Sequence, residues 1–336
     1  MAIDDKINRR KFIKQSALAT SGLALSGCLI PPFSLKEKSI FKISLAEWSL
    51  HRSIFGAGLD KSNWRIWEAA LKTDPRSVLQ GEVDHLDFAV KARQVYGLDA
   101  VEYVNVFFFD RAQDISYLNE MRTRAQGEGV KNLLIMCDHE GKLGDPDPKQ
   151  RRAAVENHFK WVQAASHLGC HSIRVNASSS GNYSEQQKLA ADGLRQLAEF
   201  GEENEINILV ENHGGLSSNG KWLRGVMQLV DHPRIGTLPD FGNFQISSDE
   251  SYDNYLGIEE LMPFAKGVSA KALDFTAEGQ ESNLDYIRLL QIVHQAGFSG
   301  YVGIEYEGDQ LSEHEGILAT KELLENTRKV LIKQEH

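Results

Sequence analysis

The chain has 336 residues, of which 41% are hydrophobic and 25% are charged, and its formal net charge at pH 7 is −10. This composition is typical of a globular protein that buries a sizeable core. Because the excess of acidic groups repels phosphate backbones, we expect no nucleic-acid partner.

The first 27 residues have the pattern of an export signal. The pair Arg9 and Arg10 precedes an apolar stretch over residues 16–27. That stretch is shorter than the about 20 residues needed to span a bilayer, and it is typical of the core of a twin-arginine signal peptide. We therefore expect residues 1–27 to be removed and the protein to work in the periplasm.

The signal ends in Leu25-Ser-Gly-Cys28, which resembles a bacterial lipobox. In a lipobox the cysteine receives the lipid and becomes the first mature residue. Cys28 would then be the only membrane attachment, and residues 28–40 would form a tether. An ordinary signal peptide with a chance cysteine is the alternative.

Eight short apolar runs, with helical patterns between them, indicate successive βα units. Because eight such units close a barrel, the sequence predicts an α/β fold, a single (β/α)8 TIM barrel over residues 41–332. The predicted strands are residues 41–48, 99–104, 132–137, 171–176, 206–211, 235–240, 267–271 and 301–305.

Helical patterns separate most of these strands, and several of them end at a glycine such as Gly169. A long segment, residues 51–82, contains Trp64 and Trp67 and is predicted to be an insertion that partly covers the barrel mouth. The predicted helices are residues 83–96, 115–126, 149–168, 184–204, 223–231, 286–296 and 313–332.

Acidic residues end three of the predicted strands. Glu211, Asp240 and Glu305 close the fifth, sixth and eighth strands, and the carboxyl ends of barrel strands meet at one mouth. Three carboxylates brought together repel one another unless they are protonated or bridged by a cation. We therefore expect a divalent metal there: Mg²⁺ or Mn²⁺ with oxygen ligands, or Zn²⁺ if His213 joins.

Further polar candidates follow the third strand and lie on the fourth. Asp138, His139 and Glu140 could each act as an acid, a base or a substrate ligand, or could instead cap a turn or face solvent; we favour His139 or Glu140. Arg174 and Asn176 share the inward face, and a buried arginine needs a carboxylate or an anionic substrate as partner.

Aromatic residues also stand at predicted strand ends. Trp48 and the phenylalanines at 107–109 could stack on a sugar ring or simply pack the rim of the barrel. On the seventh strand, Ser269 and Lys271 share one face.

At these residues the chain resembles the xylose isomerase-like TIM barrel superfamily of sugar isomerases and epimerases, which also contains the family 2 AP endonucleases. The resemblance covers nearly all of the predicted mature chain. It is carried by Met136-Cys-Asp-His-Glu-Gly141, His158-Phe-Lys-Trp161, Leu168-Gly-Cys-His-Ser-Ile-Arg-Val-Asn176, Val210-Glu-Asn-His-Gly214 and Asp240-Phe-Gly-Asn243.

The resemblance implies a metal bound by acids after the fifth and sixth strands, a histidine on the seventh and a glutamate on the eighth. Carried onto this chain, the acids are Glu211, Asp240 and Glu305, but the histidine position is Ser269. A second family histidine is replaced by Asn243, which we assign to substrate binding. His213 could complete the metal shell, or Lys271 could supply the positive charge without a metal.

Two reactions fit this set of residues. In sugar isomerisation or epimerisation, a carboxylate base removes a proton next to a carbonyl, with Glu211, Glu305, His139, Glu140 and Lys271 as catalytic candidates. In elimination from a 3-keto-glycoside the same proton is removed, and the resulting enolate expels the anomeric substituent. A non-catalytic sugar-binding lipoprotein is a third hypothesis, and each of them implies a small carbohydrate partner.

Overall fold

The computed structural model describes residues 40–59 and 62–334, which lie in one compact unit. The predicted signal peptide, Cys28 and all but the last residue of the predicted tether lie outside the described residues. Among the helices that are described, none is both long and apolar enough to cross a membrane.

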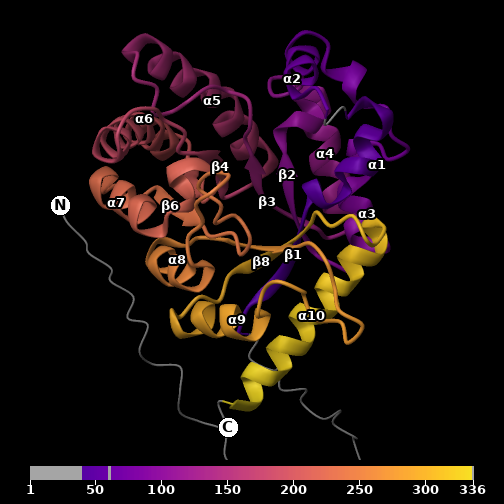
Figure 1. The fold of residues 1–336 in the computed structure, drawn as a ribbon. Helices are drawn as coiled ribbons and strands as arrows, with labels where there is room; N and C mark the ends of the chain where they lie inside the picture. The colour runs from indigo at the N-terminus through magenta and orange to yellow at the C-terminus, as the bar shows by residue number, and fades with distance from the viewer. Residues whose placement is uncertain (1–39, 60–61, 335–336) are drawn as a thin grey trace, which may run out of the picture. The chain divides into compact units, whose positions relative to one another are not determined.

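Eight parallel strands form one curled sheet in the order β6-β5-β4-β3-β2-β1-β8-β7. Figure 1 shows these strands at the centre, with the helices arranged around them. The fold is the predicted α/β TIM barrel. The strands are β1 (Lys42–Ala46), β2 (Ala100–Val104), β3 (Lys131–Met136), β4 (Ser172–Asn176), β5 (Asn207–Glu211), β6 (Ile235–Leu238), β7 (Val268–Ala272) and β8 (Tyr301–Tyr306).

The edges of the sheet meet between β6 and β7. Parallel bridges join Thr237 to Ala265 and Asp240 to Ser269. The backbone N–H of Ser269 donates to the Pro239 carbonyl at 2.9 Å, and the N–H of Phe241 donates to the Ser269 carbonyl at 3.1 Å. These contacts set Asp240, two residues after the end of β6, directly beside Ser269 of β7.

Ten α-helices are described, and the long ones cover the outer face of the sheet. Local sequence sets their ends: Asn182 and Glu185 form a reciprocal capping box at the start of α6, and Gly169 ends α5 with a φ of 77°. The helices are α1 (His51–Phe55), α2 (Trp64–Thr73), α3 (Phe88–Gln94), α4 (Ile115–Gly127), α5 (Pro148–Leu168), α6 (Tyr183–Glu203), α7 (Gly220–Val230), α8 (Asn254–Leu261), α9 (Tyr286–Gln295) and α10 (Glu313–Gln334).

All eight predicted strands are confirmed, each to within two residues at either end. Two helix predictions need correction. The helix predicted over residues 83–96 is shorter, because residues His85–Asp87 form a 3-10 turn before α3. No helix was predicted between β6 and β7, where α8 lies: Gly257 weakens its helical pattern, but a Cβ there would come within 2.0 Å of the Phe244 ring.

Close packing between α6 and the β3–α5 loop gives a test of this architecture. A Cβ at Gly193 in α6 would lie 1.9 Å from the Leu143 carbonyl oxygen, whereas a Cβ at Gly127 in α4 would meet nothing within 4 Å. We expect Gly193→Ala to lower the free energy of unfolding by about 2–3 kcal/mol through overpacking, despite alanine's higher helix propensity. Gly127→Ala should leave it unchanged or raise it by about 0.5–1 kcal/mol. Urea unfolding of both variants checks this, and equal effects would contradict the packing.

Candidate active site

A pocket of about 410 Å³ opens at the carboxyl ends of the strands. It brings together residues that are far apart in the chain. Its walls include eight of the residues that the sequence assigned to the site, together with Asp138 after the third strand, Trp64 of the insertion, and Val104, Met136 and Glu307. The eight are Trp48, His139, Arg174, Asn176, His213, Asn243, Lys271 and Glu305.

The three strand-end carboxylates form one cluster. One oxygen each of Glu211, Asp240 and Glu305 lies within 4.8 Å of the other two, and all three residues are buried. Burial and mutual repulsion raise the pKa of Glu211 and of Asp240 to about 7 each, although Arg174 and Lys271 oppose the shift. Of the three, Glu305 lines the pocket, and the other two lie behind its wall.

Ser269 connects two members of the cluster through one hydroxyl group. Its Oγ lies 2.6 Å from Asp240 Oδ2 and 3.1 Å from Glu305 Oε2. A hydroxyl can donate only one proton, so both contacts can be hydrogen bonds only if one of the two carboxyl groups is itself protonated. Serine at this position therefore favours a shared proton where a histidine would offer a metal ligand.

Asn243 and the loop after β6 hold the other oxygens of the cluster. The Asn243 side chain donates to Glu211 Oε1 at 2.9 Å, and the backbone N–H groups of Gly242 and Asn243 donate to Asp240 Oδ1 at 2.8 Å. Asn243 thus reaches both the pocket and the carboxylate cluster, where it fixes the orientation of Glu211.

Arg174 is buried, and two carboxylates supply the partners that its charge requires. Its Nε lies 2.6 Å from Glu211 Oε2, and its Nη1 donates to Asp138 Oδ1 at 2.8 Å. Asn176 donates to the same Asp138 oxygen at 2.7 Å. Burial alone would raise the pKa of Asp138, but Arg174 holds it well below its usual range. Asp138 is therefore a fixed anion that positions Arg174 and Asn176.

Lys271 supplies the second fixed cation. Its Nζ lies 3.1 Å from Glu305 Oε1 and 2.6 Å from Glu307 Oε1. Burial opposes its charge, yet the carboxylates around it raise the pKa of Lys271 well above its usual value. Lys271 is consequently charged at neutral pH and fits the role of stabilising negative charge on a ligand better than that of a base.

The charge balance and the donor set fit a bound divalent cation. Five carboxyl groups (Asp138, Glu211, Asp240, Glu305 and Glu307) face two fixed cations, Arg174 and Lys271. Three clustered carboxylate oxygens are ligands that a hard ion prefers. His213 is a pocket residue exposed to solvent and does not belong to the carboxylate cluster. The described residues therefore give no support to its predicted place in a metal shell.

The structure separates the two candidates after β3. His139 lies in the pocket with a φ of 64°, a left-handed conformation unusual for a residue with a side chain. Glu140 lines a neighbouring pocket instead, and its Oε1 accepts from Trp161 Nε1 at 2.5 Å and pairs with Lys160 Nζ at 2.9 Å. Glu140 thus fixes α5 against the barrel and does not line the strand-end pocket.

Of the aromatic candidates, only some line the pocket. Trp48 lines the pocket and stacks on the His51 ring at 4.9 Å. Phe107 and Phe108 are buried, and Phe109 packs on Trp161, so none of the three reaches this pocket. The insertion reaches it instead through Trp64, as its predicted place at the barrel mouth required.

Glu102, a buried carboxyl group in the middle of β2, is not among the residues predicted from the sequence. Burial, and to a lesser extent Glu305 and Glu211, raise the pKa of Glu102 to about 7, and Ser44 Oγ donates to its Oε1 at 2.6 Å. Gly303 makes room for it, because a Cβ there would lie 2.7 Å from Glu102 Oε1. An acid inside the apolar run Ala100–Val104 was the available signal.

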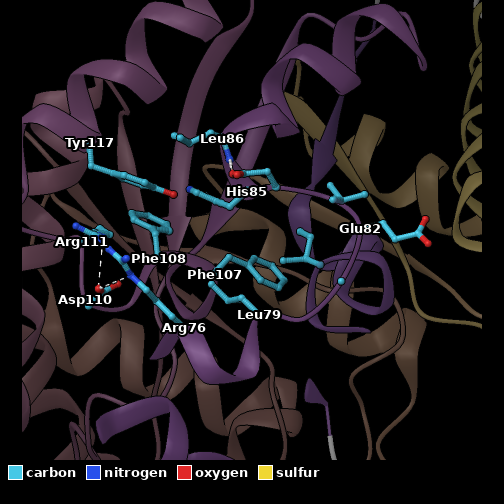
Figure 2. Close-up of a pocket in the computed structure, with 14 residues that line it drawn as sticks. Arg76, Leu79, Glu82, His85, Leu86, Phe107, Phe108, Asp110, Arg111 and Tyr117 are labelled. Carbon is cyan, nitrogen blue, oxygen red and sulfur yellow. Dashed lines mark hydrogen bonds and ion pairs between the residues drawn. The ribbon is translucent and has the colours of Figure 1, made fainter. Parts of the chain in front are cut away.

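A second and larger cavity, about 570 Å³, is lined by Phe107 and Phe108 and holds none of the clustered carboxylates (Figure 2). Both of its arginines pair with one aspartate, since Asp110 lies 3.6 Å from Arg76 and 3.3 Å from Arg111. Its His85 is buried, with Nδ1 2.6 Å from Glu47 Oε1. This arrangement stabilises the junction of β1 and β2 and leaves the strand-end pocket as the candidate active site.

The chain belongs to the xylose isomerase-like TIM barrel family, whose model matches residues 90–330. A hydroxypyruvate isomerase-like protein of Mus musculus is 26% identical over 206 residues, which is 55% of this chain and 73% of the mouse protein. Both findings agree with the resemblance that the strand-end motifs carry.

Solved structures with this fold are sugar epimerases and related barrels. The 3-keto-D-glucoside 4-epimerase of E. coli aligns with a TM-score of 0.59 at 14% identity, over 72% of this chain and 94% of its own. A xylose isomerase-like barrel protein of Mycobacterium smegmatis, solved with magnesium, aligns with a TM-score of 0.59 at 15% identity, over 87% and 97%. At these identities the likeness establishes the fold alone.

The pKa of Glu102 predicts a pH-dependent stability. The folded protein keeps a proton on this group up to about pH 7, whereas an unfolded glutamate releases it near 4.5, so the free energy of unfolding falls as the pH rises through that window. Between pH 5 and pH 8, the free energy of unfolding of Glu102→Gln should therefore rise by about 1–3 kcal/mol relative to that of the wild type. Urea unfolding with chelator present measures this.

A matched control is Glu199→Gln, which changes an exposed residue of α6. Its stability should track that of the wild type at both pH values. If the free energy of unfolding of Glu102→Gln also changes with pH as that of the wild type does, Glu102 does not carry the proton that its burial implies.

Proposed function

We propose that the protein is an isomerase or epimerase that removes a proton next to the carbonyl of a sugar or keto-sugar. The proposal rests on one observation: in the strand-end pocket, Glu305 Oε1 lies 3.1 Å from Nζ of the fixed cation Lys271. A carboxylate beside a cation supplies the two groups that enolate formation needs. The family supports this class of reaction, because relatives with the same fold are named as isomerases and epimerases.

In the proposed step, the Glu305 carboxylate takes the proton from the carbon next to the carbonyl. The C–H electron pair forms a C=C bond, and the carbonyl π pair moves to oxygen, where Lys271 stabilises the enolate charge. Return of a proton to the opposite face of the same carbon, with the carbonyl re-formed, gives an epimer. Return to the former carbonyl carbon, with transfer of the hydroxyl proton of the neighbouring carbon to the former carbonyl oxygen, gives an isomer. His139 and Asn176 line the same pocket and are proposed to bind substrate hydroxyl groups, together with Trp48, Arg174, His213 and Asn243.

We further propose that Glu211, Asp240 and Glu305 hold a divalent ion, Mg²⁺, Mn²⁺ or Zn²⁺. When bound, such an ion polarises a carbonyl oxygen and offsets the excess of carboxylate charge. Two observations support this proposal: one oxygen of each carboxyl group lies within 4.8 Å of the other two, and the pKa values of Glu211 and Asp240 are raised. Solved structures of this fold with magnesium and with zinc are consistent with the proposal.

Elimination from a 3-keto-glycoside is the second candidate, because it begins with the same proton transfer and the pocket has an aromatic rim that includes Trp64. After the enolate forms, its oxygen pair re-forms the carbonyl, and the enolate C=C pair becomes a double bond to the anomeric carbon. The anomeric C–O bond breaks, and the substituent leaves as an alcohol once protonated. A sugar-binding protein without catalysis remains the alternative in which the carboxylates only bind ligand.

The carboxylate roles can be tested by isosteric changes. We expect Glu305→Gln to reduce turnover of a ketose or keto-glycoside substrate at least about 100-fold, as for loss of a positioned base. Glu211→Gln should also reduce turnover and should lower the metal content of the purified protein. Activity assays and elemental analysis measure these effects.

Glu199→Gln serves again as the control, because that carboxylate is exposed on α6 and outside the pocket. Full turnover in both Glu211→Gln and Glu305→Gln would show that the proposed centre is not the catalytic one. Sugar binding without turnover in the wild type would favour the non-catalytic alternative.

We also propose that the protein is exported through the twin-arginine pathway and anchored in the periplasm by a lipid on Cys28. The support is the order of Arg9-Arg10, an apolar stretch and Leu25-Ser-Gly-Cys28 in the sequence. In that compartment, free sugars and glycosides are more accessible substrates than phosphorylated intermediates.

Cell fractionation separates the two signals. Cys28→Ala should leave export intact and move the protein from the membrane fraction to the soluble periplasmic fraction, because only the lipid is lost. Replacing Arg9 and Arg10 together by lysine should instead keep the protein in the cytoplasm. A Cys28→Ala protein that fractionates like the wild type would favour the ordinary signal peptide.

A further inference from the structure

The helix α2 carries an exposed tryptophan to the rim of the candidate active site. Trp64 begins this helix, and the Asn63 side chain accepts a hydrogen bond from the backbone N–H of Ile66 at its N-terminus. Trp64 is 46% exposed and lines the pocket, whereas Ile66 is 63% exposed and does not. Because an exposed indole loses the benefit of burial, its place at a pocket rim points to a ligand.

The indole is held from behind by buried aromatic residues. Trp64 stacks on Trp67 with ring centroids 4.9 Å apart and planes at 12°. Trp67 is 2% exposed and packs edge-on against Phe55 at 5.3 Å. One face of the Trp64 indole is thus covered by a fixed ring, and the exposed part is presented in a defined orientation.

The same helix contacts a pocket residue of the barrel. Trp67 lies edge-on to the His139 ring at 5.5 Å, and Glu68 Oε1 lies 3.4 Å from His139 Nδ1. His139 also lines the pocket. The position of Trp64 is therefore coupled, through Trp67 and Glu68, to a residue that follows strand β3.

Two tryptophans from different parts of the chain line this one pocket. Trp48 follows β1, and Trp64 comes from the insertion, while Glu305, Lys271 and Asn176 are polar pocket residues on the strands. A volume of about 410 Å³ lies within the range of roughly 300–1,000 Å³ that holds ligands larger than a few carbon atoms. The pocket has a polar region for a reacting carbonyl and an aromatic rim for an apolar ring face.

We propose that Trp64 is the platform for the second ring of a two-ring glycoside, whose first ring reacts at Glu305 and Lys271. This inference rests on the proposed function and specifies its substrate class: keto-glycosides with a sugar as the anomeric substituent. The face of a pyranose ring presents C–H groups that pack on an indole, and a single open-chain sugar bound at Lys271 has no second ring to cover Trp64.

The test uses two substrates that differ only in the anomeric substituent. One is methyl β-glucoside oxidised to the ketone at C3, and the other is cellobiose oxidised at C3 of its non-reducing ring. Trp64→Ala should lower kcat/KM for the cellobiose derivative about tenfold, the size expected for loss of one aromatic contact, and change the methyl derivative less than about twofold. Trp64→Phe should recover most of the loss, and Ile66→Ala should behave like the wild type.

Equal losses on both substrates, or no loss on either, would overturn the platform while leaving the proposed function intact. If the wild type turns over neither compound, calorimetric binding of both decides the question. A preference for the cellobiose derivative that disappears in Trp64→Ala would support the platform and count against the proposed reaction. Absence of any preference would overturn the platform itself.

Discussion

Burial of several carboxyl groups in one small volume is the constraint on which the rest of the site depends. Carboxylates removed from water are unfavourable unless cations, donors or protons accompany them. Here Arg174 lies 2.6 Å from Glu211, Lys271 lies 3.1 Å from Glu305, and Ser269 contacts Asp240 at 2.6 Å. Each acid therefore has its own partner, and the remaining negative charge is what a ligand or a divalent ion can meet.

The barrel makes this concentration of charge possible. Strands β5 and β8 are apolar along most of their length and carry Glu211 and Glu305 at or next to their carboxyl ends, so the packed interior and the reactive mouth are distinct there. That periodic arrangement is visible in the sequence, and the strand positions could be predicted to within two residues. The convergence of Glu211, Asp240 and Glu305 followed from strand direction alone. Helix α8 escaped prediction because its own pattern is short and is interrupted by Gly257, which is required by the packing of Phe244.

Side-chain direction accounts for what the sequence could not provide. His139 and Glu140 are neighbours in the chain, yet the left-handed backbone at His139 places one in the pocket and leaves the other with Trp161 and Lys160. No periodicity argument distinguishes two such residues in a loop. Likewise, the role of Trp64 depends on its stacking against Trp67, which is a tertiary property of the insertion.

The contact between Gly303 and Glu102 has a consequence for how relatives of this protein can vary. Because the Glu102 carboxyl occupies the space where a Cβ at position 303 would lie, at 2.7 Å from Oε1, a change of side-chain size at one position affects the other. Any larger residue on β8 at that point requires a smaller one on β2, and a barrel that lost the acid would be left with a cavity unless the glycine were also replaced. These two positions should therefore covary across the family, and the pair would mark barrels that keep an ionisable group beneath the active site.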